Sequence, residues 1–69
     1  MSDIPSEHVD FDNTVVRNES DEAIEVELDD GRTFWIPKSQ VHDDSEAYEM
    51  GTDGTLIIPE WLADSKGMT

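Results

Sequence analysis

Three consecutive segments decide the fold: Ala-Ile-Glu-Val-Glu-Leu at residues 23–28, Asp-Asp-Gly-Arg at 29–32 and Thr-Phe-Trp-Ile at 33–36. In the first segment, apolar side chains alternate with glutamates, which is the period-two pattern of a half-buried strand. Asp and Gly tolerate the positive φ angles of a tight turn. Together the segments predict a β-hairpin with one apolar and one anionic face. Pro37 ends its pairing because proline has no N–H for the ladder.

Three further segments extend this hairpin into a sheet. Residues 13–17 predict a first strand and residues 55–58 a strongly apolar late strand, while residues 47–50 are interpreted as a short edge strand. Between them, residues 38–41 are expected to form a short turn that places Val41 on the core, and residues 42–46 an exposed acidic loop. The expected fold is mostly β, of the α+β class, with a curled antiparallel sheet or small barrel of four or five strands.

A short C-terminal helix is expected over residues 59–66. Pro59 suits the first position of a helix, and Glu60 complements the positive end of the helix dipole. Lys66 and Gly67 are typical stop signals.

The length allows a single domain. A chain of 69 residues buries only about 60% of the surface that its unfolded form exposes, so its core is small. Residues 1–12 are rich in Ser, Asp and Glu, and we interpret them as a flexible acidic arm ahead of a domain at residues 13–69. The arm has no basic start and no apolar run, which predicts neither a signal peptide nor a membrane anchor and favours a cytoplasmic location.

The apolar positions of the best-patterned elements predict the core. Trp35 is also interpreted as a core residue, whereas Trp61 fits a core position and an interface equally well. The predicted core comprises Ile24, Val26, Leu28, Phe34, Ile36, Leu56, Ile58 and Leu62.

The charge limits the function classes. With 18 Asp and Glu against 4 Lys and Arg, the net charge is -14. Phosphate binding needs clustered Lys and Arg, so direct binding to DNA or RNA is not expected, and the same sign argument disfavours an anionic membrane.

Catalysis and cofactor binding are not expected either. Cysteine is absent, so thiolate sites and cysteine nucleophiles do not arise. His42, Asp43, Asp44 and Glu46 offer nitrogen and oxygen ligands, but the ligand spacing of a helix-loop calcium site is missing around them. A general acid/base pair needs a carboxyl group in an apolar pocket, for which this core leaves little room. We therefore predict a binding protein with neither a catalytic nor a metal site.

Two motifs resemble a group of small phage and prophage proteins. One is Trp-Ile-Pro-Lys-Ser-Gln at residues 35–40, and the other is Ile-Pro-Glu-Trp-Leu-Ala at 58–63, closing with Lys66 and Gly67. In that group a strand ending in the first motif is followed by an acidic loop and a strand that enters the helix of the second. The resemblance covers about residues 23–67 and implies a similar fold and a viral context, and in that context an anti-defence role such as anti-CRISPR or anti-restriction activity. Most members have no assigned activity.

The acidity itself suggests nucleic-acid mimicry. A compact chain of this length has a diameter of about 28 Å, so its charge corresponds to roughly one per 2 Å, against about one per 1.7 Å of axis in duplex DNA. Such a protein would occupy the basic groove of a nucleic-acid-binding protein, for example a host CRISPR effector or restriction enzyme. The residues expected to contact this partner are Glu25, Glu27, Asp29, Asp30, Asp43, Asp44, Glu46 and Trp61.

Two interpretations of the acidity remain open from the sequence, namely mimicry and salt adaptation. Acidic side chains spread along a chain with few lysines also suit a salt-adapted proteome, in which the charge serves solvation. The protein would then be a non-mimic interaction module that uses Trp61 and the turn at Lys38 to join a larger viral or cellular assembly. Mimicry requires a continuous anionic face, whereas salt adaptation predicts even coverage.

Overall fold

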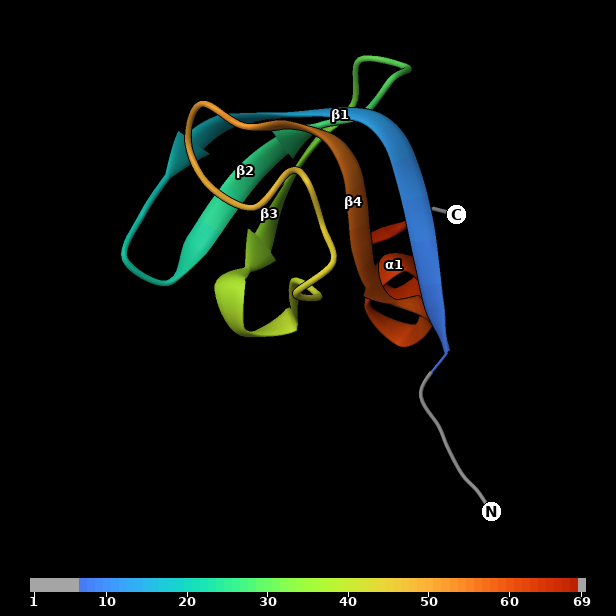
Figure 1. The fold of residues 1–69 in the computed structure, drawn as a ribbon. Helices are drawn as coiled ribbons and strands as arrows, with labels where there is room; N and C mark the ends of the chain where they lie inside the picture. The colour runs from blue at the N-terminus through green and yellow to red at the C-terminus, as the bar shows by residue number, and fades with distance from the viewer. Residues whose placement is uncertain (1–6, 69) are drawn as a thin grey trace.

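The computed structural model describes residues 7–68 as a four-stranded antiparallel sheet, not closed into a barrel, with one short helix. The mostly β fold class is thereby confirmed. The strand order is β3-β2-β1-β4, and α1 lies beside β1 and β4 (Figure 1). The elements are β1 (His8–Glu19), β2 (Ala23–Glu27), β3 (Thr33–Pro37), the 3₁₀ helix η1 (Lys38–Gln40), β4 (Asp53–Pro59) and α1 (Glu60–Lys66).

The β2–β3 hairpin forms as its alternating pattern predicts. The Leu28 N–H donates to the Arg32 carbonyl at 2.8 Å, and the Gly31 N–H donates to the Leu28 carbonyl at 2.9 Å. Gly31 has a φ of 91°, in the left-handed region that glycine adopts without a Cβ penalty. The turn is further fixed by Asp30, whose carboxylate accepts bonds from the backbone N–H and the guanidinium of Arg32.

β1 begins earlier than expected. Residues 8–12, interpreted as part of a flexible arm, form its first part and pair with β4. The reason is a second alternation, in which Val9 and Phe11 pack against the core while Asp10 points away. This part of the arm prediction is wrong, and residues 1–6 of the arm lie outside the described residues.

Two irregularities allow this long strand to serve two neighbours. The register shifts between Phe11 and Thr14 and again between Val16 and Asn18, so the first part of β1 pairs with β4 and the last part with β2. Asn13 has a φ of 58°, and the buried Thr14 hydroxyl donates to the Phe11 carbonyl at 2.8 Å. Bulges of this kind bend a strand, and Figure 1 shows β1 curving beside β4.

The core lies between the inner face of the sheet and α1. Of the eight predicted core residues, seven are buried, and Phe34 is half-buried against the cluster. The core prediction for Trp35 is wrong, since 45% of this residue is exposed. Successive strand side chains point to opposite faces, so inward Phe34 and Ile36 force Trp35 outward. The buried apolar residues are Val16, Ile24, Val26, Leu28, Ile36, Ala47, Leu56, Ile58, Leu62, Ala63 and Met68.

Residues 42–47 cover the outer edge of β4, and the strand expected at 47–50 does not form. The N–H groups of His42 and Glu46 donate to the carbonyls of Ile57 and Thr55 at 2.9 and 2.7 Å. Side chains complete the pairing: the buried Ser45 hydroxyl bonds both the N–H and the carbonyl of Ile57. Residues 42–47 thus pair with β4 partly through side chains and not through a regular backbone ladder. A segment of this kind needs no alternation of apolar and polar residues, and its sequence shows none.

α1 begins at Glu60, with Pro59 as its N-cap, and ends at Lys66. Gly67 stops it with a left-handed φ of 75°, and the Met68 N–H donates to the Ala63 carbonyl. Its buried residues Leu62 and Ala63 face the sheet. No helix within residues 7–68 has the length and apolar character needed to cross a bilayer.

Candidate functional site

The outer face of the sheet gathers carboxylates from three strands. Glu25 and Glu27 of β2 point away from the buried Ile24 and Val26 and are half-buried. Through the register, Glu27 lies opposite Val15 of β1, and Val15 lies opposite Asp53 of β4. Directly opposed residues share a face, so Asp53 belongs to this surface.

The first part of β1 adds Asp10 and Asp12 to the same face. Asp10 is paired with Ile57 and alternates with the inward Val9 and Phe11. The Asp12 carboxylate accepts a hydrogen bond from the outward Thr55 hydroxyl at 3.1 Å. We name the surface formed by Asp10, Asp12, Glu25, Glu27 and Asp53 the outer acidic face.

Sequence reasoning found only the β2 members of the outer acidic face. Asp10 and Asp12 fall within the segment interpreted as the arm, and Asp53 falls outside every strand that the sequence predicts. The signal that could have found the first two is the alternation of Val9 and Phe11 with aspartates. Asp53 depends on the register between β1 and β4, which a single-strand pattern does not contain.

Some acids of this face are already partnered. The Arg17 guanidinium lies 2.6 Å from the Glu27 carboxylate, and the Asn18 amide donates to Glu25 at 2.7 Å. Within residues 7–68, Asp10 and Asp53 are exposed and their side chains make neither a hydrogen bond nor an ion pair. These two carboxylates are therefore the ones most available to a cationic partner.

The adjoining hairpin turn holds Asp29 and Asp30. The Arg32 backbone N–H, with its guanidinium at 2.7 Å, lowers the pKa of Asp30 below its ordinary value of 3.8. Asp29 is exposed. Asp30 thus stabilises the turn, while Asp29 is an exposed acid two residues beyond the end of β2.

The predicted loop acids lie elsewhere. Residues 42–47 flank β4, with β1 and β4 between them and β2, so Asp43, Asp44 and Glu46 do not join Glu25 and Glu27. Asp43 and Asp44 are exposed, but Glu46 accepts the Thr55 N–H at 3.1 Å and so has a structural task.

Trp61 is placed in a third region, on α1, with 61% of the residue exposed. The eight predicted contact residues therefore occupy three separate places: β2 with its turn, the loop, and the helix.

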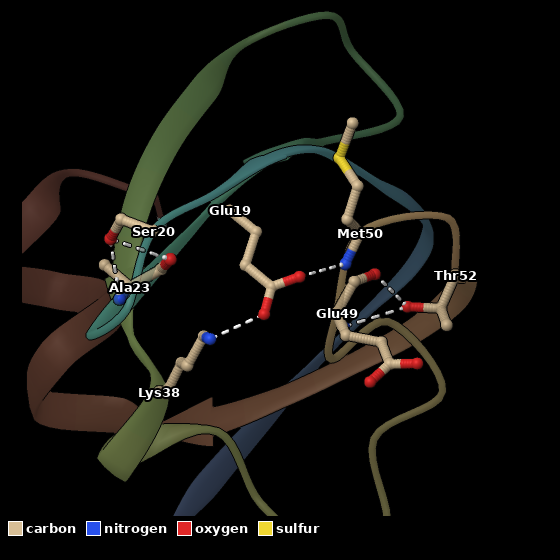
Figure 2. A network of polar contacts seen from close by, with 7 residues as sticks. All are labelled: Glu19, Ser20, Ala23, Lys38, Glu49, Met50 and Thr52. Carbon is tan, nitrogen blue, oxygen red and sulfur yellow. Dashed lines mark hydrogen bonds and ion pairs between the residues drawn. The ribbon is translucent and has the colours of Figure 1, made fainter.

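A polar network ties η1 to the end of β1 (Figure 2). Glu19 accepts one bond from the Lys38 ammonium at 2.5 Å and another from the Met50 N–H at 3.0 Å. The Lys38 hydrogen bond, followed by that of Met50, lowers the pKa of Glu19 below its ordinary value of 4.5. Thr52 closes the neighbouring turn by donating to the Glu49 carbonyl at 2.6 Å. The Lys38 ammonium is already paired with Glu19 of the same chain. This pairing argues against Lys38 as a contact residue in the non-mimic alternative.

The geometry includes no preformed cluster for a metal ion: within the described residues, no group of three or more His, Asp or Glu side chains is placed to hold one. No family model, curated protein or solved structure matches the chain.

Proposed function

We propose that this protein is a non-catalytic inhibitor that places its outer acidic face against a basic nucleic-acid-binding surface of another protein. The observation that carries the proposal is the gathering of Asp10, Asp12, Glu25, Glu27 and Asp53 on one face of the sheet, with Arg17 as the cation paired there. A rigid sheet presents these charges without the entropy cost of ordering loops on binding.

The spacing of the charges suits a surface that normally binds phosphates. Glu25 and Glu27, two positions apart on one strand, lie about 6.8 Å apart, and neighbouring strands add rows about 4.8 Å away. Over the longest extent of 37 Å, the net charge of -14 amounts to about one per 2.6 Å, against one per 1.7 Å in duplex DNA. The charge density is lower than that of a duplex but of the same order.

The proposed mechanism is competition. Carboxylates that contact the lysines and arginines of a nucleic-acid groove exclude the nucleic acid by sterics and by charge. In the viral context implied by the Trp-Ile-Pro-Lys-Ser-Gln and Pro-Glu-Trp-Leu-Ala motifs, the target would be a host defence complex in the cytoplasm, such as a CRISPR effector or a restriction enzyme.

A second candidate function uses the helix. Trp61 is 61% exposed on α1, and exposed tryptophans are frequent energetic centres of interfaces. In this alternative the protein is a non-mimic interaction module of a viral or cellular assembly, and its acidic side chains, those of the outer acidic face included, serve solvation in a salt-adapted proteome.

A matched pair of double charge reversals separates the two. D10K/D53K reverses two exposed acids of the outer acidic face. D43K/E49K reverses two exposed acids of the connection between η1 and β4. Both variants change the net charge by the same amount, so a difference in binding between them reports where the charges lie and not how many there are. Each immobilised protein is exposed to bacterial lysate, and retained proteins are eluted with duplex DNA.

The proposal expects DNA-eluted proteins on the parent and on D43K/E49K, and their loss from D10K/D53K. Equal retention by both variants, with loss on W61A, would instead support the interaction module. If duplex DNA elutes nothing that the parent retains, the mimicry proposal is wrong.

A further inference from the structure

β3 forms one edge of the sheet, since the strand order is β3-β2-β1-β4. The hydrogen bonds at the two ends of the β2–β3 ladder show which backbone groups of β3 face that edge. The Leu28 N–H donates to Arg32, and the Lys38 N–H donates to Glu22, each at 2.8 Å. Hydrogen-bonded pairs alternate along an antiparallel ladder, so Ile24–Ile36 and Val26–Phe34 are the other bonded pairs.

The intervening residues of β3 therefore turn their N–H and C=O groups to the open side. These residues are Thr33, Trp35 and Pro37, each opposite a residue of β2 in a non-hydrogen-bonded pair. Pro37 does not end the pairing, contrary to the sequence prediction: it lies opposite Ala23, and the Lys38 N–H beyond it still donates to Glu22. The proline is compatible with this position because its missing N–H would point away from β2. Within residues 7–68, these outward N–H and C=O groups of Thr33 and Trp35 have no hydrogen-bond partner, and both residues are exposed.

The two edges of the sheet differ in whether their backbone hydrogen-bonding groups have partners. The edge of β4 is closed by residues 42–47, where Ser45 and Glu46 satisfy backbone groups of β4 with their side chains. The edge of β3 carries unpaired backbone groups and, at its centre, a tryptophan that is 45% exposed. Unpaired edges are templates for an added strand, and natural proteins usually blunt them.

Charge selects the kind of strand that can be added. On the outer face, Trp35 lies directly opposite Glu25 of β2, with Glu27 two residues along. A lysine or arginine on an added strand would pass over the Trp35 ring, where a cation is attracted to the aromatic face, and approach Glu25. A second copy of this chain would bring a net charge of -14 against an equal charge, which disfavours self-pairing at this edge.

We propose that β3 accepts an extended basic segment of a partner protein as an additional strand, with its Lys or Arg side chains at alternate positions over Trp35 and toward Glu25. The inference takes from the proposed function that the partner is basic. It adds how the partner binds, namely as an extra strand at the edge of β3. The backbone groups of Thr33 and Trp35 supply the hydrogen bonds, and the alternation of cations supplies the specificity.

The test uses two synthetic peptides and the whole protein. The first is Lys-Val-Lys-Val-Lys-Val-Lys, and the second has the same sequence with N-methyl groups on the alternate backbone nitrogens that would face β3. A peptide with the opposite set methylated is the control, because its pairing groups stay free. Binding is measured by titration, and amide hydrogen exchange is followed at Thr33 and Trp35.

The inference expects fast exchange at Thr33 and Trp35 in the free protein and protection when the first or the control peptide binds. The edge-methylated peptide should bind at least about tenfold more weakly, a difference of about 1.4 kcal/mol. The W35A substitution should also weaken binding of the first peptide. It removes an exposed side chain, so the fold should be preserved.

Two outcomes would overturn the inference. Equal binding of all three peptides without protection at Thr33 and Trp35 would show attraction to the acidic surface alone, and the proposed function would survive without this mode. Protection of these amides at high protein concentration without peptide, together with dimers in sedimentation, would make a second copy the occupant.

Discussion

Replacement of Ser45 by alanine tests how the edge of β4 is closed. The Ser45 hydroxyl accepts the Ile57 N–H at 2.9 Å and donates to the Ile57 carbonyl at 3.2 Å, and Ser45 is 7% exposed. The carbonyl keeps a second partner in S45A, because the His42 N–H donates to it at 2.9 Å. The Ile57 N–H loses the partner that the structure gives it, so its desolvation sets the cost.

An unsatisfied buried donor costs about 1–3 kcal/mol. For a domain of this size each kcal/mol lowers Tm by about 4–8 °C. Thermal and urea unfolding should show this loss in S45A, whereas S39A, at an exposed serine of η1, should stay within about 0.5 kcal/mol of the parent. If S45A unfolds with the same free energy as S39A, the hydroxyl does not close this edge and the reasoning is wrong.

Three further predictions concern the fold. V26D should lose its cooperative thermal transition, because Val26 is fully buried and an ionised carboxylate cannot be solvated there; a parent-like transition would contradict the strand register. G54A should lose about 1–3 kcal/mol in urea unfolding, since Gly54 has a φ of 124° and an added Cβ would lie 2.5 Å from Glu46 Oε1; stability equal to the parent would mean that this contact relaxes freely. E19Q should unfold at a lower Tm than the parent at pH 7, and the gap should close as pH falls from about 4.5 through the lowered pKa of Glu19, because the ionised form is the one stabilised; a constant gap would refute that role.

The hairpin was predictable because its information is local. The alternation around Glu25 and Glu27 sets two faces, and Gly31 permits the turn, so the segment needs no distant partner to be understood. The same rule exposes the error on Trp35, since neighbouring strand residues cannot both point inward. Here the sequence contained the answer, because Phe34 and Ile36 already take the inward positions of this strand.

Other features depend on contacts far along the chain. Ser45 is buried because its hydroxyl replaces a strand partner of Ile57, and nothing in the sequence around it marks this role. Asp53 reaches the outer acidic face only through the register of β4 with β1. The open edge of β3 likewise follows from strand order and bonding parity, which pattern alone does not give.

The most direct test of the proposed function is a competition measured by fluorescence anisotropy. The protein that duplex DNA elutes from the immobilised chain is bound to labelled duplex, and the unlabelled chain is titrated in. We predict that the parent and D43K/E49K displace the duplex completely, and that D10K/D53K does so at least about tenfold more weakly, because lysines would then face a basic surface. A stable complex in which duplex and chain remain bound together, or equal displacement by all three proteins, would contradict the account.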